Sequence, residues 1–379
     1  MDFEFTPEQT RVRDAVREFA ETHVRPVAED LDRTGRWPEE LIPRMAEVGL
    51  MGMSVPKDLG GSGWDAVSCV AAVEEISKVC PTTAVIAAAH CSLGTMPIVH
   101  FGTEEQKRKY VPRMARGELI GCMALTEPEA GSDAANLQTT ATEDGDHWVL
   151  NGTKHFIANG SRADVCVLYA VTDPGRGHRG ISTLVVEKGT PGFEVVRDYE
   201  KLGISALPTS ELRFENCRIP KENLLGQRGR GFPIVMQVLD AGRVGVAAQA
   251  VGIAQACLEE AIDYARTRVQ FGAPIAKLEA IQWMIADMAT EIEAARWLTY
   301  RVAWLEDRGL RVTRESSMAK LFASQMVNHV AYQNVQIHGG YGYMKDYPAE
   351  RHFRDARITE IYEGTSEIQR LVIATQLLR

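Results

Sequence analysis

The sequence predicts a multidomain α+β fold, in which a helical N-terminal part, a central antiparallel β domain and a C-terminal helical bundle follow one another. Two observations indicate this order. Apolar residues recur at helical spacing in the first and last thirds of the chain, whereas the middle third consists of short β-rich segments bounded by Gly, Pro or Asn. No long helical pattern interrupts those segments, so parallel βαβ units are not expected.

Residues 1–117 are expected to form the N-terminal helical domain. In its first segment, apolar residues lie at mostly helical spacing, namely Val12, Val16, Phe19 and Val24. The Gly-rich stretch LGGSGWD then interrupts the pattern. A second helical stretch, AVSCVAAVEEISKV, is followed by Pro81 as a predicted stop. A short polar helix in TEEQKRKYVPRMARGE completes this part.

Residues 118–226 are expected to form the central β domain. The stretch EDGDHWVLNG contains an Asp-Gly turn between two strand-like runs, which is a hairpin signal. Further β-rich runs follow in ADVCVLYAVT, GISTLVVEKG and SELRFENCRIP. Together they predict an antiparallel sheet or barrel.

Residues 227–379 are expected to form a bundle of long helices. The clearest evidence is an apolar stripe that advances by three or four residues at nearly every step: Leu278, Ile281, Ile285, Met288, Ile292, Ala295, Leu298, Val302 and Leu305. Helix stops are predicted at Gly272, at Gly309 and at the Gly339-Gly340 pair.

The composition is that of an ordinary globular protein, with 45% hydrophobic and 25% charged residues among 379. The net charge of −9 argues against a nucleic-acid-binding face and against a polybasic membrane anchor. No uninterrupted apolar run approaches the roughly 20 residues of a membrane helix. The acidic N-terminus carries no signal-peptide pattern, so a cytoplasmic protein without membrane insertion is expected.

The seven cysteines form no CxxC motif and no disulfide framework, and the nine histidines show no metal-ligand spacing. A structural or catalytic metal is therefore not expected. Most of the cysteines are interpreted as small buried apolar residues of a protein in a reducing compartment.

The stretch IYEGTSEIQR places a single carboxylate, Glu363, just before a helix. Ser366 to Gln369 fit a capping box, so the last helix is predicted to begin near Glu367. Gly364 lets the chain bend sharply. Free N–H groups at a helix start also favour an anion such as a pyrophosphate. From this stretch alone, Glu363 is either an acid–base catalyst or a solvated residue of the cap.

A second stretch, MALTEPEAGSD at residues 123–133, joins a predicted strand end to Gly131, Ser132 and Asp133. Small residues allow backbone N–H groups to approach a ligand closely, and the hydroxyls of Thr126 and Ser132 add donors. By itself this could be a tight loop, but the string is long and specific.

Together, LTEPEAGSD and DARITEIYEGTSEIQR resemble the two signatures of the acyl-CoA dehydrogenase family. NGTKHFIANG, RVQFGAPI and QIHGGYGY fall between them in the family's order, so that the resemblance covers essentially the whole chain. It implies a helical domain, a barrel-like β domain and a C-terminal four-helix bundle. It also implies FAD as cofactor without a Rossmann fingerprint, and no GxGxxG follows a predicted strand here.

The resemblance implies α,β-dehydrogenation of an acyl-CoA thioester to a trans-2-enoyl-CoA, as in fatty acid metabolism. Glu363 is the expected base for the α-proton, and flavin N5 is the expected hydride acceptor. Burial should raise the pKa of this carboxyl toward ~6–7. Electrons would pass to an electron-transferring flavoprotein, and the chain would form a homo-oligomer, expected to be a tetramer.

The family's other site residues carry over by position. Cofactor contacts are expected from Met123, Leu125, Thr126, Gly131, Ser132, Phe156, Ile157, Ala158, Thr365 and Glu367. Contacts to the FAD of a neighbouring subunit are expected from Arg268, Gln270, Phe271, Gln336, Gly339 and Gly340. Substrate contacts are expected from Ser132, Asp240, Arg243, Gly364 and Cys91.

Three positions bear on the substrate and on flavin tuning. One branch of the family draws its base from the position that matches Gly242, which has no side chain here, and this favours the short/medium-chain-like branch. Ala158 lacks the hydroxyl that many members direct at the flavin. Cys91 is interpreted as part of the wall of the predicted acyl cavity. The expected substrate carries a short- or medium-chain acyl group, and an alicyclic or branched acyl group is the alternative.

Two other functions are compatible with the same fold. The chain could be an acyl-CoA oxidase or an enoyl-CoA reductase, because the sequence does not determine the electron acceptor. A non-catalytic scaffold that binds CoA is the third reading, against which the intact Glu363 argues.

Overall fold

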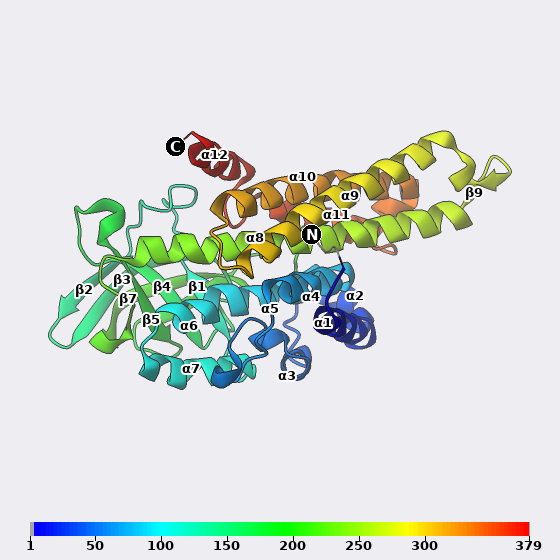
Figure 1. The fold of residues 1–379 in the computed structure, drawn as a ribbon. Coiled ribbons are helices and arrows are strands. Elements are labelled where there is room, and N and C mark those ends of the chain that lie inside the picture. The colour runs from blue at the N-terminus through cyan, green and yellow to red at the C-terminus, as the bar shows by residue number, and fades with distance from the viewer. Residues whose placement is uncertain (1–3, 379) are drawn as a thin grey trace.

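The N-terminal part of the chain is helical in the computed structural model, which describes residues 4–378 (Figure 1). The first predicted helical segment is divided by a π-helical turn at Ala20–Val24. The helix AVSCVAAVEEISKV ends at Val79, so the stop predicted before Pro81 is confirmed, and Pro81 itself starts the next helix, where its missing N–H costs nothing in the first turn. The α-helices are α1 (Pro7–Phe19), α2 (Arg25–Thr34), α3 (Leu41–Glu47), α4 (Ala66–Val79), α5 (Pro81–Ala88), α6 (Met96–Phe101) and α7 (Glu104–Ala115).

The central part is a mostly antiparallel sheet of order β6-β7-β3-β2-β4-β5-β8, with β1 paired to β4. The predicted Asp-Gly hairpin is confirmed, because β2 and β3 pair antiparallel across Gly145. Strand β4 pairs in parallel with β1 and β2, and the sheet is open rather than closed into a barrel. The strands are β1 (Gly121–Ala124), β2 (Thr140–Asp144), β3 (His147–Ala158), β4 (Val165–Val171), β5 (Ile181–Glu187), β6 (Phe193–Asp198), β7 (Thr209–Pro220) and β8 (Leu224–Leu225).

The C-terminal part is a helical bundle, as predicted. The apolar stripe belongs to α9, and α10 ends next to Gly339, which has a φ of 60°. The stop predicted at Gly272 is wrong by several residues, because β9 (Val269–Gln270) and β10 (Ala273–Pro274) form a small hairpin there. The helices are α8 (Gly231–Thr267), α9 (Glu279–Glu306), α10 (Thr313–His338), α11 (Ala349–Ala356) and α12 (Ser366–Leu377).

Helix α8 connects the three parts. Its N-terminal end lies beside the β domain, its middle packs on α4 and α5, and its C-terminal end extends into the bundle with α9 and α10 (Figure 1). Two helical stretches, Pro81–Phe101 and Gly231–Thr267, have the length and hydropathy of a membrane span. However, 72% and 67% of their apolar windows are buried inside the protein, which is the environment of core helices.

Close approach between α8 and α4 depends on Gly252. A Cβ atom at this position would lie 2.4 Å from the Glu74 carbonyl oxygen and 2.7 Å from the Ser77 Cβ. Both contacts are shorter than any van der Waals distance, and one of them is to backbone that cannot rotate away. The glycine therefore sets the spacing at which the N-terminal helices pack on the bundle.

We expect Gly252→Ala to destabilise the protein by about 1–3 kcal/mol, because the added methyl group forces α8 and α4 apart. Gly245→Ala on the same helix is the matched control. A Cβ there meets nothing within 4 Å, so alanine should leave stability unchanged or raise it through its better helix propensity. Thermal unfolding of both variants checks this, and a Gly252→Ala variant as stable as Gly245→Ala would contradict it.

Candidate active site

Glu363 lies on a strained turn at the mouth of α12. Its φ is 54° and that of Gly364 is 93°. A non-glycine residue with positive φ is uncommon and is often retained at functional sites. Gln369, from the first turns of α12, donates through Nε2 to the carbonyl oxygens of Glu363 (3.1 Å) and Gly364 (2.8 Å). These bonds hold the turn in its conformation.

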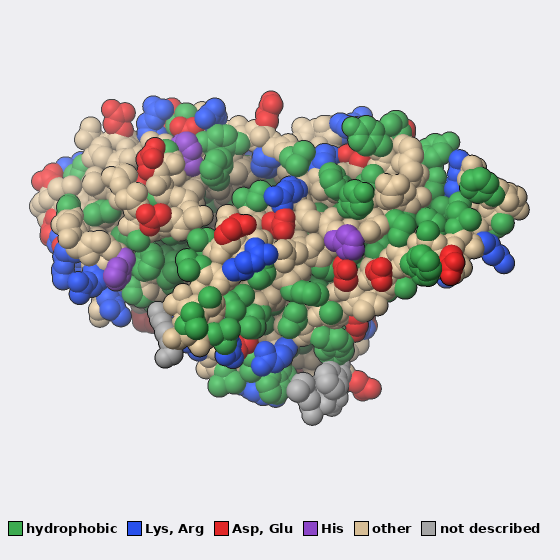
Figure 2. All heavy atoms as spheres, turned by 90° about the horizontal axis from the view of Figure 1, so that it is seen from above, with side chains coloured by type: hydrophobic (Ala, Val, Ile, Leu, Met, Phe, Trp, Pro, Cys, Tyr) green, Lys and Arg blue, Asp and Glu red, His purple; other side chains and the backbone are tan. Residues whose placement is uncertain are grey.

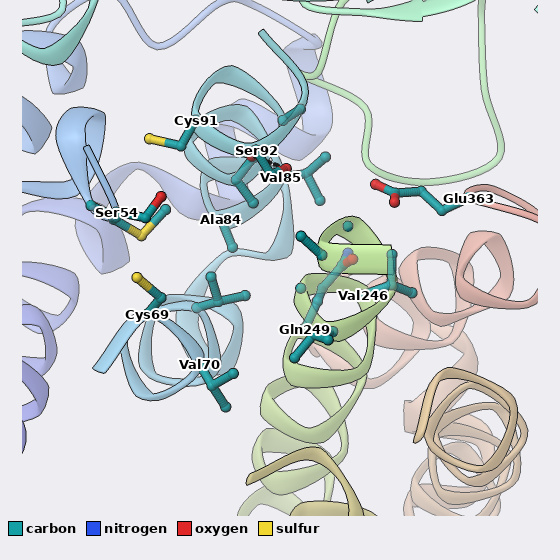
Figure 3. A pocket seen from close by; sticks show the side chains of 18 of the residues that line it. Ser54, Cys69, Val70, Ala84, Val85, Cys91, Ser92, Val246, Gln249 and Glu363 are labelled. Carbon is teal, nitrogen blue, oxygen red and sulfur yellow. Dashed lines mark hydrogen bonds between the residues drawn. The ribbon is translucent and has the colours of Figure 1, made fainter. Parts of the chain in front are cut away.

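The carboxylate of Glu363 points from this turn into a space between α5 and α8 (Figure 3). On the α8 side it lies against Gly242, where an added Cβ would come within 1.8 Å of Glu363 Oε2. The absent side chain at this position thus makes room for the carboxylate. The Oε2 atom is buried and accepts no hydrogen bond from any residue in the described part of the chain.

Burial raises the pKa of Glu363 to about 7, while the positive charges of Arg243 and Lys320 oppose that rise. Arg243 is 4% exposed and donates from Nη1 to Asp240 Oδ1 at 2.8 Å. Lys320 is fully buried and donates from Nζ to the Gly364 carbonyl oxygen at 2.8 Å. A carboxyl group with a pKa near the physiological pH can accept a proton and release it again.

The space in front of Glu363 is a cavity of about 160 Å³ (Figure 3). Its walls come from α4, α5, the π-helical turn Ala89–Thr95 and α8, and most of the lining side chains are apolar. Cys91 lines this cavity, and burial raises the pKa of its thiol to about 12, which makes it a poor base. π-Helical turns within α-helices occur frequently at functional sites.

The cofactor residues predicted in the β domain come together at the ends of β1 and β3. His155 N donates to the Thr126 carbonyl oxygen at 2.8 Å, and the buried Lys154 Nζ donates to the Leu125 carbonyl oxygen at 2.9 Å. These bonds align the two predicted runs, Met123–Thr126 and Phe156–Ala158. Phe156 has a φ of 60° and is 62% exposed, although it is a large aromatic residue.

The adjacent loop leaves space for a ligand. Gly131 and Ser132 are exposed, and a Cβ atom at Gly131 would meet nothing within 4 Å. Thr365 and Glu367 lie at the start of α12. The predicted cap is wrong by one residue: Thr365, not Ser366, is the N-cap and accepts from Ile368 N at 3.4 Å. Gln369, the expected fourth residue of the capping box, instead donates hydrogen bonds to the carbonyl oxygens of the Glu363–Gly364 turn.

The second predicted set of cofactor residues lies at the opposite end of the molecule. This end is the tip of the bundle that carries β9 in Figure 1. A cavity of about 560 Å³ there is lined by residues that include Arg268, Gln270, Gly339 and Gly340. Gln336 lies in the last turn of α10 that leads into it. Phe271 is 93% exposed with a φ of 53°.

The two sets cannot share one cofactor within one chain. They are separated by most of α8, whose 37 residues span roughly 55 Å at 1.5 Å per residue. This separation agrees with the expectation that the second set contacts the FAD of a neighbouring subunit. The first set fits a flat ring system, because it offers an exposed aromatic face at Phe156 beside an open Gly131–Ser132 loop.

The structure places the predicted substrate residues Asp240 and Arg243 next to the Glu363 turn, on α8. Both are engaged within the chain, since Asp240 Oδ2 also accepts from the Thr313 hydroxyl at 2.6 Å. Contact of either residue with CoA stays a prediction.

Sequence reasoning missed three polar residues around Glu363. They are Lys320 on α10, Gln249 on α8 and Glu306 at the end of α9, and the latter two line the cavity. Burial and then the charges of Asp307 and Asp240 raise the pKa of Glu306 to about 7. Each lies in a helix whose neighbouring residues follow an apolar pattern, so a polar residue at that position was the only sequence signal for a role in the site.

Models of the acyl-CoA dehydrogenase family match nearly the whole chain. The N-terminal domain model matches residues 6–118, the middle domain model residues 122–217 and the C-terminal domain model residues 229–378. Among curated proteins, the short-chain specific acyl-CoA dehydrogenase of Clostridium acetobutylicum is 50% identical over the full length of both chains. An acryloyl-CoA reductase (NADH) of Anaerotignum propionicum is also 50% identical, over all of this chain and 96% of its own.

Solved structures agree with this result. Butyryl-CoA dehydrogenase from Megasphaera elsdenii superposes with a TM-score of 0.98 at 43% identity, over the whole of both chains. A chain from a structural study of the electron transferring flavoprotein of Acidaminococcus fermentans superposes with a TM-score of 0.99 at 48% identity, again over both whole chains. The protein therefore belongs to the acyl-CoA dehydrogenase family and is an FAD-dependent oxidoreductase.

Proposed function

We propose that this enzyme oxidises a short acyl-CoA to the trans-2-enoyl-CoA, with Glu363 as the base that removes the α-proton. The observation that carries the proposal is the Glu363 Oε2 atom, which is buried, lacks a hydrogen-bond donor and points into an apolar cavity. A buried carboxylate without partners is costly, so its retention favours a catalytic role over a structural one.

The surroundings of Glu363 suit proton abstraction next to a thioester. No acceptor in the described residues takes its backbone N–H, which is therefore free to donate to the thioester carbonyl oxygen as negative charge develops there. The apolar walls of α4, α5 and α8 exclude water and strengthen that interaction. When bound, FAD supplies a two-electron oxidant that takes up hydride from the β-carbon.

The size of the cavity supports a short acyl group. A cavity of about 150 Å³ holds a benzene-sized molecule of about six carbons, and the present one measures about 160 Å³. The relatives named short-chain specific and butyryl-CoA dehydrogenases agree with this. Medium-chain, branched and alicyclic acyl groups are the alternatives that a substrate panel must separate.

We further propose an assembly of at least two chains, expected to be a tetramer, with an electron-transferring flavoprotein as acceptor. The division of the cofactor residues between opposite ends of α8 supports a shared site. Figure 2 also shows hydrophobic side chains over the bundle half of the molecule. On α9 and α10, the large side chains of Trp283, Phe322 and Tyr332 are exposed. The free, mostly buried cysteines are consistent with a cytoplasmic location.

A reductase is the second candidate function, favoured by the 50% identity to an acryloyl-CoA reductase (NADH). The same base and cavity would then act in the opposite direction, with Glu363 donating a proton to the α-carbon. Comparing butyryl-CoA-dependent reduction of an electron-transferring flavoprotein with NADH-dependent reduction of acryloyl-CoA separates the two directions.

Glu363→Gln should retain bound FAD and acyl-CoA while slowing anaerobic flavin reduction about 10³-fold, since the amide cannot accept the proton. Stopped-flow absorbance of the flavin measures this. The control is Glu215→Gln, which changes an exposed carboxylate of β7 and should react like the wild type. Near-normal flavin reduction in Glu363→Gln would assign the base to another residue.

The kcat/KM for flavin reduction should rise with pH to a plateau, with a midpoint near 7. The sign follows from the raised pKa of Glu363: below about 7 the carboxyl is protonated and cannot act as a base, and above it the carboxylate is available. Measurements between pH 5.5 and 8.5, about 1.5 pH units on either side of the midpoint, test this. A profile that is flat or falls across this range is incompatible with Glu363 as base.

A panel of acyl-CoA thioesters should show the highest kcat/KM for chains of about four to six carbons, given the cavity volume. Anaerobic flavin bleaching reports cofactor, activity and chain preference together. Including a cyclohexyl thioester tests the alicyclic alternative. A preference for chains much longer than this would show that the cavity opens further on binding.

A further inference from the structure

Lys320 of α10 is fully buried, and no step proposed above uses it. Its Nζ donates to the Gly364 carbonyl oxygen at 2.8 Å. A buried ammonium is costly, and burial lowers the pKa of Lys320 to about 8. Such a residue persists when its charge or its hydrogen bond contributes to stability or function.

Lys320 differs from the other buried cations in its partners. Among residues 4–378, the buried lysine and arginine residues are Lys154, Arg243 and Lys320. Lys154 has the Glu127 carboxylate at 2.7 Å, and Arg243 has that of Asp240 at 2.8 Å. Lys320 forms no such ion pair, and the carboxylate that acts on it most strongly through space is Glu363.

The hydrogen bond of Lys320 reaches the strained part of the turn. The Gly364 carbonyl oxygen accepts from Lys320 on one side and from Gln369 of α12 on the other, at 2.8 Å each. Lys320 thereby connects α10, a long helix of the bundle core, to the residue that follows Glu363. The turn is held between two helices instead of depending on its own backbone preferences.

We propose that Lys320 is a positioning residue for the reaction: it fixes the Glu363–Gly364 turn against α10 and, together with Arg243, supplies positive charge that keeps Glu363 available as an anion. This inference rests on the proposed role of Glu363. It assigns a function to a side chain that does not touch the carboxylate and acts on it through the turn and through space.

The other charged groups near Glu363 do not replace Lys320. On α8, Arg243 acts on Glu363 through space more strongly than Lys320 does, but it is paired with Asp240 and makes no hydrogen bond to the Glu363–Gly364 turn in the described chain. Tyr362 is next to Glu363 in sequence and is neutral, because burial raises the pKa of its hydroxyl. Glu306 of α9 lines the same cavity and supplies no positive charge. Two further negative charges act on Lys320: Glu360, shortly before Glu363 in the chain, and Glu367 of α12. The lining side chains of α4 and α5 carry no charge.

The test is the pH dependence of kcat/KM for flavin reduction in Lys320→Met, Lys320→Gln and Lys320→Arg. Removing the charge in the first two should move the acidic limb upward by about one pH unit or more, because an opposite charge nearby lowers a carboxyl pKa by that order. Lys320→Arg keeps the charge and should keep the wild-type midpoint. Lys188→Met removes an exposed lysine of the β domain and should leave the profile unchanged.

An infrared titration adds a readout that needs no turnover. The carboxyl C=O band of Glu363, identified by its absence in Glu363→Gln, should titrate at higher pH in Lys320→Gln than in the wild type. Lys320→Gln retains a donor, so it separates the charge from the hydrogen bond even where Lys320→Met folds poorly.

The outcomes separate this inference from the proposed function. Unchanged midpoints in Lys320→Gln, with Glu363→Gln inactive, would overturn the role of Lys320 and leave the base assignment intact. Normal flavin reduction in Glu363→Gln would overturn the base assignment itself.

Discussion

The site depends on one carboxylate that the fold holds in an apolar cavity. Water is excluded from one face of Glu363 by α5 and α8, and no donor in the described chain reaches its Oε2 atom. This dehydration raises the carboxyl pKa, and the charges of Arg243 and Lys320 limit the rise. The balance between burial and nearby positive charge keeps the pKa of Glu363 near neutral pH, where the carboxyl group can both accept and donate a proton.

Small residues on α8 make this arrangement sterically possible. Gly242 leaves space for the carboxylate, and Gly252, nearly three turns further along, allows α4 to approach the helix backbone. The same helix therefore sets both the position of the proposed base and the packing of the N-terminal domain that forms the cavity wall. Errors in helix spacing would be transmitted to the site, because closely packed interiors do not absorb displacement.

The length of α8 explains why the predicted cofactor residues form two groups. Phe156 and the loop at Gly131 lie on the β domain, whereas Arg268 and Phe271 lie beyond the other end of the helix. Exposed aromatic residues with positive φ occur in both groups, at Phe156 and Phe271. Strained, exposed aromatic residues are unfavourable in an isolated chain, which supports the proposal that both groups are halves of sites completed by FAD and by another subunit.

The sequence alone determined the order of the three parts, the long helices of the bundle and the turn that carries Glu363. Periodicity, the Asp-Gly hairpin and the Gly-Thr-Ser segment are local signals, and local signals can be read from neighbouring residues. Only the tertiary structure decided that Thr365 rather than Ser366 caps α12, that the sheet stays open, and that Gly242 and Lys320 meet the Glu363 turn. The contacts of Lys320 and Gly242 with this turn join residues that are 44 and 121 positions apart, from Lys320 to Gly364 and from Gly242 to Glu363. They depend on how helices pack, and helix packing is set by side-chain shapes across the interface and not by the pattern along one helix.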